Sequence, residues 1–172
     1  VPRGDVPGEW YAPTQPHPTK PPPFDRQGVT VDDVIDFTPE LRAEALEILE
    51  DFAYGPIYEP ITVEGDGRRG TIIMPGFGGG ANWHGAAVDP ETGWLYVPSR
   101  TTPLVIQLAL PDPGESDMRY QPVSGSLEGP QGLPLWKPPY VLLSAFDLNT
   151  GSREWMVPLG DGPRQQVMDL GV

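Results

Sequence analysis

The chain has 172 residues, of which 38% are hydrophobic, so it is long enough to bury one ordinary core. Its 11 Lys and Arg against 24 Asp and Glu give a formal net charge of -13, and this acidic balance argues against a nucleic-acid partner. The absence of cysteine excludes disulfides and thiolate metal sites, and no apolar run approaches the ~20 residues that a membrane helix needs.

The chain opens on Val1 and carries no signal peptide at that end, so we expect it to be the middle of a longer protein. Residues 1–37 are rich in proline, which favours extended polyproline geometry without donors for a sheet ladder. We call this segment the strap. Trp10, Tyr11 and Phe24 flank its proline run and predict that it is anchored on a larger body. The alternative is a ligand for a proline-recognising domain, although such ligands are usually mobile tails.

Residues 38–54 are predicted to form one amphipathic helix. Thr38 is a suitable N-cap, Pro39 suits the first helical position, and Gly55 is placed to end the helix. The apolar residues of one face are Leu41, Ala45, Ile48, Leu49 and Phe52. The carboxylates elsewhere on this helix are interpreted as a solvated face, and Asp32, Asp33 and Asp36 as turn and capping residues rather than metal ligands.

The stretch 78–97 is the most informative in the chain. A glycine run is followed by an amide and an indole side by side, Asn82 and Trp83. Residues 89–93 have the composition of a turn, and residues 94–97 that of a returning strand. The residues alone leave two interpretations of the pair open: a contact pair held by a β-hairpin, or a turn amide satisfied by backbone beside a core aromatic.

A second stretch, residues 141–157, repeats this pattern. The spacing Ala-x-Asp-x-x-Thr-Gly occurs at residues 87–93 and again, 58 residues further along, at 145–151, with Trp155 following. Such self-similarity indicates stacked β-units such as propeller blades. Ala145, Asp147 and Trp155 are expected to be structural, the carboxylate satisfying turn donors and the indole packing between blades.

The expected fold is mainly β, in a single domain that forms part of a propeller. Residues 70–160 would form one four-stranded antiparallel blade interrupted by a long insertion at residues 99–139, in which residues 104–110 add a strand, and residues 161–172 would form a tail. The expected blade strands are residues 82–88, 94–98, 140–146 and 153–157, with residues 71–74 belonging to the preceding blade. A single blade cannot bury both of its apolar faces alone.

Several segments together resemble the membrane-associated pyrroloquinoline quinone (PQQ) dehydrogenases of the glucose dehydrogenase type. They are Gly-Gly-Ala-Asn-Trp at residues 79–83, Ala-x-Asp-Pro-Glu-Thr-Gly-x-Leu-Tyr-Val at 87–97, and the segments 13–28, 36–42 and 132–140. Residues 145–155 are similar to the tryptophan docking motif that locks adjacent blades in these quinoproteins. The resemblance covers almost the whole chain.

The resemblance implies an eight-bladed β-propeller that holds PQQ and Ca²⁺ on its axis. It also implies oxidation of a sugar, polyol or alcohol by hydride transfer to PQQ, a membrane quinone as electron acceptor, and a membrane-associated, periplasmic location. Asn82 matches a family contact near the ortho-quinone oxygens of PQQ, and Trp83 would help to wall the site. No position matches the family's catalytic aspartate, its calcium ligands or its cationic residue beside the quinone, so the chain is expected to be inactive by itself.

Departures from the family keep an alternative open. His84 stands where relatives often have a small residue, and a lone histidine is more often a surface or packed residue than a site residue. The alternative is a non-catalytic β-propeller module that binds a partner or associates with copies of itself through its uncovered faces.

Overall fold

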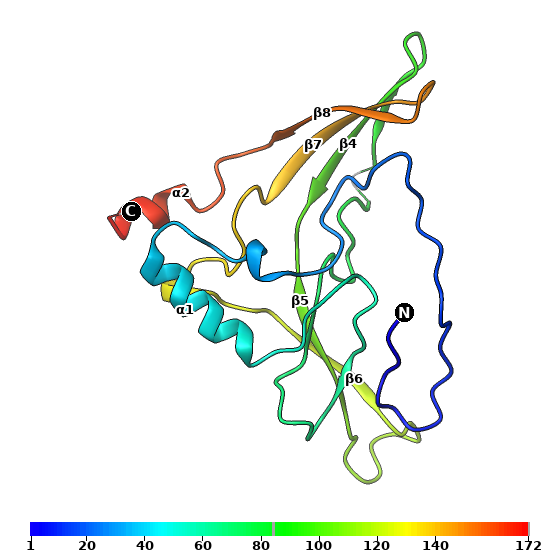
Figure 1. The fold of residues 1–172 in the computed structure, drawn as a ribbon, viewed down its shortest axis with the longest axis vertical. Helices are drawn as coiled ribbons and strands as arrows, with labels where there is room; N and C mark the ends of the chain where they lie inside the picture. The colour runs from blue at the N-terminus through cyan, green and yellow to red at the C-terminus, as the bar shows by residue number, and fades with distance from the viewer. Residues whose placement is uncertain (84, 172) are drawn as a thin grey trace.

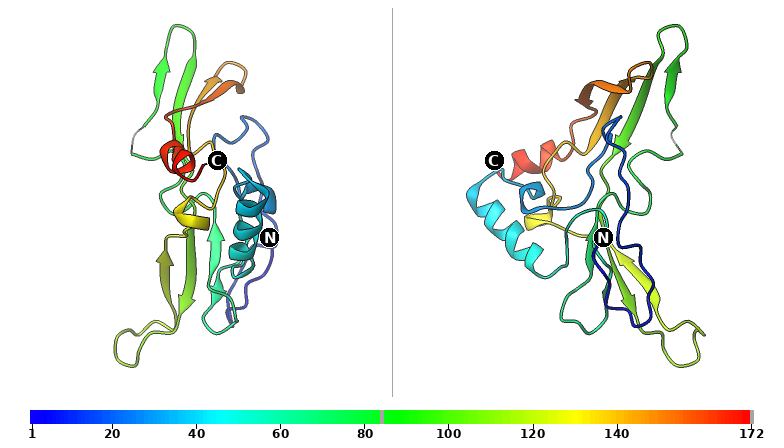
Figure 2. Two further views of the ribbon diagram at one scale, coloured as in Figure 1. Left: turned by 90° about the vertical axis from the view of Figure 1, so that its left-hand side faces the viewer. Right: turned by 45° about the vertical axis from the view of Figure 1, so that its right-hand side comes forward.

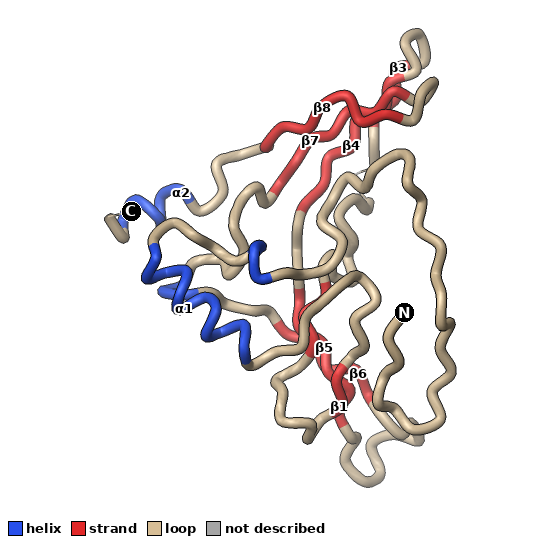
Figure 3. The backbone as a smooth tube through the Cα atoms, viewed as in Figure 1, coloured by secondary structure: helices blue, strands red, loops and turns tan. Residues whose placement is uncertain are grey.

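The computed structural model describes residues 1–83 and 85–171, and the expectation for His84 lies outside them. Two four-stranded sheets follow one another along the long axis of the molecule, with a helix beside the second (Figures 1 and 2). Much of the remaining chain is loop (Figure 3). In chain order the elements are η1 (Val31–Asp33), α1 (Pro39–Glu50), β1 (Thr62–Val63), β2 (Thr71–Ile73), β3 (Ala87–Asp89), β4 (Trp94–Arg100), β5 (Leu104–Ala109), β6 (Gln121–Gly125), η2 (Pro130–Gly132), β7 (Val141–Asp147), β8 (Ser152–Pro158) and α2 (Arg164–Asp169).

The first sheet has the strand order β3-β4-β7-β8, and every neighbouring pair is antiparallel. This confirms the predicted four-stranded blade and places both Thr-Gly hairpins in one sheet. The central pairing runs from Trp94 opposite Asp147 to Arg100 opposite Val141. We call this sheet the blade.

The predicted first blade strand, residues 82–88, is wrong in its extent, because β3 covers only Ala87–Asp89. The preceding residues close local turns instead: the Gly85 amide donates to the Asn82 carbonyl at 2.9 Å. Gly85 also has a φ of 70°, a left-handed conformation that is incompatible with a continuous strand.

The second sheet is built from residues on both sides of the first hairpin. β2 pairs with β5 in antiparallel fashion and β1 pairs with β5 in parallel, each along part of its length, while β6 pairs with β5 antiparallel. The predicted strand at residues 104–110 is therefore confirmed as β5. Sequence reasoning missed β6, and it did not anticipate that residues 71–73 pair with the insertion.

α1 confirms the predicted helix start. Thr38 accepts a hydrogen bond from the Leu41 amide at 3.2 Å, and proline follows it at the first helical position. The helix ends earlier than predicted, at Glu50 with Asp51 as its cap, so Gly55 does not end it. The reason is tertiary, because Ala53 pairs with the second sheet through bonds to Gly70 and Ile72.

The main core lies between α1, η2 and the second sheet. Its buried residues come from the strap, from α1 and the turn after it, from the second sheet and the residue after β2, and from the segment after η2: Val29, Val34, Ile35, Leu41, Ala45, Leu49, Phe52, Ile72, Met74, Val105, Leu133, Leu135 and Trp136. The end of the strap thus enters the core. Trp10 is 85% exposed and does not anchor the strap on this chain, so its packing on a larger body stays a prediction.

The tail predicted for residues 161–172 contains a short helix, α2, which follows the turn at Pro163. Val167 of α2 packs against the core cluster, so this segment is not merely a trailing end. Within the described residues, no helix combines the length and apolar character that crossing a bilayer would require.

Candidate functional site

The pair Asn82 and Trp83 lies on a loop that we call the glycine loop, residues 76–85 without His84. Local bonds shape this loop: the Asn82 Nδ2 donates to the Gly78 carbonyl at 2.9 Å, and the Gly79 amide to the Gly76 carbonyl at 2.8 Å. The loop is tied to the chain after β4 by the Gly76 amide, which donates to the Thr102 carbonyl at 3.2 Å. Its position is therefore fixed by backbone bonds, while its side chains remain accessible.

Asn82 has the bonding of a turn amide, and its contact with a bound group stays a prediction. One amide hydrogen is used by the backbone, as a turn amide would be, yet the residue is exposed. The Nδ2 group has a second hydrogen, and the Oδ1 atom can accept. Asn82 can therefore still donate to a bound oxygen without leaving its turn.

Trp83 is 95% exposed, so it is not part of this chain's own core. An uncovered indole beside an exposed amide offers a flat apolar surface next to a hydrogen-bond donor. These two groups are of the kind that a planar, oxygen-bearing ring system contacts, by stacking and by hydrogen bonding.

The two Thr-Gly turns are built alike. Asp89 accepts from the Glu91 amide and the Thr92 hydroxyl, and Asp147 accepts from the Asn149 amide and the Thr150 hydroxyl. These hydrogen bonds lower the pKa of both carboxyls, led by the Thr92 hydroxyl at Asp89 and the Asn149 amide at Asp147. The prediction that the Asp147 carboxylate satisfies turn donors is confirmed, and Asp89 does the same in the first turn.

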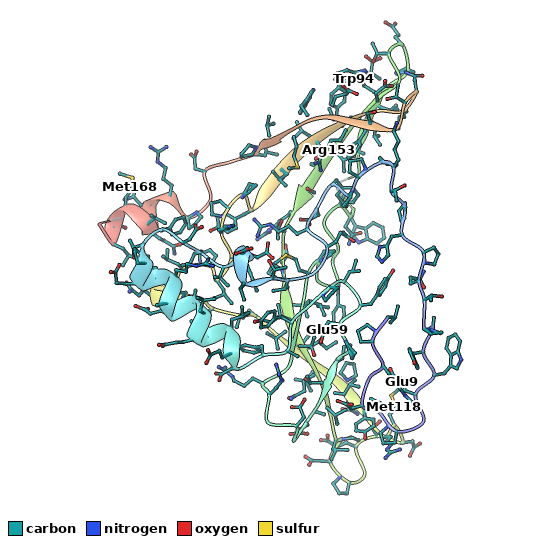
Figure 4. All side chains as sticks on the ribbon, in the orientation of Figure 1. Glu9, Glu59, Trp94, Met118, Arg153 and Met168 are labelled. Atoms are coloured by element: carbon teal, nitrogen blue, oxygen red, sulfur yellow. The ribbon has the colours of Figure 1, made fainter. Side chains whose placement is uncertain are left out.

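Aromatic side chains line one face of the blade. The rings of Tyr96 and Trp155 lie 6.0 Å apart, and those of Trp94 and Tyr96 lie 6.3 Å apart. Trp94 lies at the far end of the blade in Figure 4. Trp155 is 36% exposed, so this face is only partly covered by its own chain. Packing of Trp155 between blades stays a prediction.

A hollow of about 680 Å³ lies elsewhere, between the end of β4, the η2 region and the turn before α2. Arg100, Trp136, Tyr140 and Gln166 contribute to its walls, whereas Asn82 and Trp83 do not. Burial raises the pKa of the Tyr140 phenol to about 12, an effect that nearby Arg26 partly opposes. Sequence analysis did not identify this hollow, because its walls come from segments far apart in the chain.

A second feature that sequence analysis missed is the carboxylate of Asp25. It lies in the strap, is 7% exposed, and contacts both Thr101 and the glycine loop. The only sequence signal is an acidic residue directly after the proline run and Phe24. Among the described residues, no group of three or more acidic or histidine side chains could hold a metal ion.

Comparison with known proteins places these features in context. A family profile described as "PQQ: Glucose/ethanol/alcohol dehydrogenase, beta-propeller domain" matches residues 1–172. The quinate/shikimate dehydrogenase (quinone) of Acinetobacter baylyi is 28% identical over 176 residues, covering 91% of this chain and 21% of the relative. The glycerol dehydrogenase large subunit of Gluconobacter oxydans is 26% identical over 184 residues, covering 91% of this chain and 24% of the relative.

A shorter match is to a relative that is named with cytochrome c rather than a quinone. Lupanine 17-hydroxylase [cytochrome c] of a Pseudomonas species is 42% identical over 50 residues, covering 29% of this chain and 7% of the relative. The chain thus spans less than a quarter of the length of each of these relatives, with 24% the largest share.

Proposed function

The chain belongs to the glucose/ethanol/alcohol dehydrogenase family of PQQ-dependent β-propellers, and we propose that it supplies one blade and part of the cofactor wall of a dehydrogenase for a sugar, polyol or alcohol. In this proposal Asn82 and Trp83 contact PQQ. The observation that carries it is that two consecutive residues, Asn82 and Trp83, both expose their side chains on a loop tied by backbone bonds.

The chemistry of Asn82 and Trp83 fits contact with PQQ. When bound, PQQ supplies an ortho-quinone that accepts the electrons of the substrate. The free hydrogen of the Asn82 Nδ2 group can donate to an oxygen that gains negative charge, which stabilises that charge. The Trp83 indole can cover one side of a flat ring and exclude water from it. We assign no residue of this chain as catalytic base or as calcium ligand.

The names of relatives support the substrate class. Those named for quinate or shikimate and for glycerol act on hydroxylated compounds, so we propose a hydroxylated substrate here. The quinone named for one relative supports a membrane quinone as acceptor, although lupanine 17-hydroxylase is named with cytochrome c instead. We further propose Ca²⁺ bound by residues outside this chain, and a periplasmic, membrane-associated setting for the whole protein.

The test separates binding from turnover. The purified chain is titrated with PQQ and Ca²⁺, and binding is followed by quenching of tryptophan fluorescence. Asn82→Ala should weaken PQQ binding by about tenfold, the effect of one lost hydrogen bond. Asn149→Ala, which removes an amide from a turn of the blade, is the matched control. Equal affinity of wild type and Asn82→Ala would contradict the assignment.

Turnover is measured on the same samples with a dye acceptor and a panel of sugars and polyols. We expect none, because the catalytic base is not supplied by this chain. Appreciable turnover would show that the expected inactivity is wrong. Activity of a longer protein that contains this chain, and its loss there with Asn82→Ala, would support the role of this wall.

A second candidate is a binding module that associates with copies of itself. The observation in its favour is the exposure of neighbouring side chains on β8, with Trp155 at 36%, Met156 at 40% and Val157 at 44%. Sedimentation velocity tests it. A mass above the 18.7 kDa of one chain, reduced by Trp155→Ser, would support self-association, and a monomer at all concentrations would exclude it.

A further inference from the structure

Asp25 is a buried carboxylate that joins three segments of the chain. Its Oδ1 atom accepts hydrogen bonds from the Thr101 hydroxyl at 2.7 Å and from the Arg26 amide at 2.8 Å. Thr101 is itself 9% exposed, so this contact is shielded from water. Its Oδ2 atom is buried and has no hydrogen-bond partner within the described residues. Buried polar atoms without partners are rare, so this position calls for an explanation.

The Asp25 carboxylate packs directly against the backbone of Gly80 in the glycine loop. A Cβ atom added at Gly80 would come within 2.7 Å of the Asp25 Cβ and 2.9 Å of its Cγ, and it would meet Oδ2 as well. Gly80 does not have a left-handed φ, so the contact with Asp25 is what requires glycine there. The neighbouring Gly78 differs, because a Cβ there would meet nothing within 4 Å.

The backbone at the end of β4 also bonds to Gly80. The Arg100 amide, at the end of β4, donates to the Gly80 carbonyl at 2.8 Å. The next residue, Thr101, donates to Asp25. Gly80 is therefore held by a backbone hydrogen bond from the end of β4 and by packing against Asp25 of the strap. Asn82 follows Gly80 by only two residues, so the position of the Asn82 side-chain amide depends on these two contacts.

We propose that Asp25 is a positioning residue for Asn82. Its buried carboxylate, held by the hydrogen bond from Thr101, packs against Gly80 and so fixes the position of the glycine loop. Asp25 touches neither a substrate nor a cofactor in this proposal and acts through the loop. The link to PQQ rests on the proposed function of Asn82, whereas the mechanical link between Asp25 and the loop does not.

Amide hydrogen exchange of the full 172-residue chain, measured by NMR, tests the mechanical link. Three amides report on the glycine loop, those of Gly79, Gly85 and Arg100, because each is bonded within it or to it. Asp25→Ala should make them exchange about tenfold faster by local opening. The Leu148 amide, bonded to Gly93 in the blade, should exchange as in the wild type and so exclude global unfolding.

Two further variants make the test specific. Asp25→Asn keeps an Oδ1 acceptor for Thr101 at the same place and should restore slow exchange. Gly80→Ala should speed exchange. The double variant Asp25→Gly/Gly80→Ala should exchange more slowly than Gly80→Ala alone, because Asp25→Gly removes the Cβ atom of residue 25 as well as its carboxylate and so makes room for the methyl group. Gly78→Ala is the matched control and should leave the loop amides unchanged.

The outcomes separate this inference from the proposed function. Wild-type exchange in Asp25→Ala, or simple additivity in the double variant, would overturn the mechanical link. If Asp25→Ala unfolds globally, Thr101→Val removes the same hydrogen bond and must still open the loop. If the wild-type chain binds PQQ, Asp25→Ala should weaken binding about tenfold and Asp25→Asn should not, and unchanged affinity would overturn the role toward Asn82. Failure of the wild type to bind PQQ counts against the proposed function. The exchange data still test, independently of PQQ, whether Asp25 holds the glycine loop at Gly80.

Discussion

Asn149, in the second Thr-Gly turn, donates a hydrogen bond from its side-chain Nδ2 to the backbone carbonyl of Thr92 in the first turn, at 3.1 Å. The same Nδ2 also donates to Asp147 at 2.9 Å, and the Leu148 amide donates to the Gly93 carbonyl at 2.9 Å. The two turns that share a sequence pattern are thus bonded to one another at one end of the blade. The repeat does more than shape two separate hairpins, because it also joins them.

Replacing Asn149 should therefore destabilise the blade. Asn149→Ala removes the bonds from Nδ2 to Thr92 and to Asp147 and should lower the free energy of unfolding by about 1–2 kcal/mol, from a usual net value of about 0.5–1.5 kcal/mol for each hydrogen bond. Urea denaturation followed by far-ultraviolet circular dichroism measures it. Asn82→Ala removes only the single local bond to the Gly78 carbonyl, which lies outside the sheet, and should cost less stability than Asn149→Ala. Equal losses in the two variants would contradict the cross-turn bond.

The two turn carboxylates should make stability depend on acid pH. The pKa of Asp89 and of Asp147 is lowered below the ordinary 3.8 in the folded chain. Their stabilising contribution is thus present above pH 3.8 and is lost as pH falls through the lower folded pKa. The double variant Asp89→Asn/Asp147→Asn should show a smaller loss of stability between pH 5 and pH 2 than the wild type, in the window set by these shifts.

Chemical denaturation across that pH range checks this expectation. The substitution Asp112→Asn, in the connection between β5 and β6, controls for the change of net charge. If Asp112→Asn reduces the loss of stability at acid pH as much as the double turn variant does, general charge repulsion rather than turn bonding is responsible.

Tyr140 should produce a loss of stability at the alkaline end. Its folded pKa of about 12 lies above the ordinary 10.0, so the folded state keeps the phenol proton where the unfolded state releases it. Stability should therefore fall as pH rises from 10 towards 12. Tyr140→Phe should remove this dependence, and it should cost little at pH 7 because the phenol oxygen has no hydrogen-bond partner among the described residues.

Thermal melts at pH 8 and at pH 11 compare the two proteins. Tyr54→Phe serves as a control for the loss of a phenol elsewhere. An alkaline decline of the same size in Tyr140→Phe and the wild type would exclude Tyr140 as its source.

Gly28 should not tolerate a side chain. It has a φ of 92°, and an added Cβ would lie 2.6 Å from the Gly55 carbonyl oxygen and 2.8 Å from the Ile57 nitrogen. Gly28→Ala should thus cost about 3 kcal/mol or more, because backbone atoms cannot move aside as a flexible side chain can. Gly8 has a similar φ of 83° but nothing within 4 Å, so Gly8→Ala should cost at most about 1–2 kcal/mol, the penalty of the left-handed conformation alone.

Comparative melts of the two alanine variants separate crowding from conformation. A loss in Gly8→Ala as large as that in Gly28→Ala would show that the left-handed conformation, and not the contact with residues 55–57, dominates.

Sequence reasoning identified what depends on local patterns. The alternation and turn chemistry around Asp89 and Asp147 located four blade strands to within one or two residues, apart from the start of β3. The N-cap at Thr38 was found because capping uses neighbouring residues. The end of α1 was misplaced because Ala53 is drawn into a bridge with Thr71, and no local signal reports such a pairing.

The site was only partly accessible from the sequence, for the same reason. Asn82 and Trp83 stood out by type and spacing beside a glycine run. Asp25 did not, because its significance comes from Thr101 and Gly80, which lie 76 and 55 positions away. Arg153 is similar: it lies beside the strap, labelled in Figure 4, and donates to the Pro23 carbonyl at 2.9 Å.

The long path between β4 and β7 bears on the order in which this chain folds. The hairpins β3–β4, β5–β6 and β7–β8 each pair strands that are close in sequence. The pairing of β4 with β7 instead closes a loop that contains the whole segment from Thr101 to Tyr140. Closing such a large loop costs chain entropy before any contact compensates for it. The three hairpins should therefore appear first during refolding, and the seam between β4 and β7 should form last and set the rate.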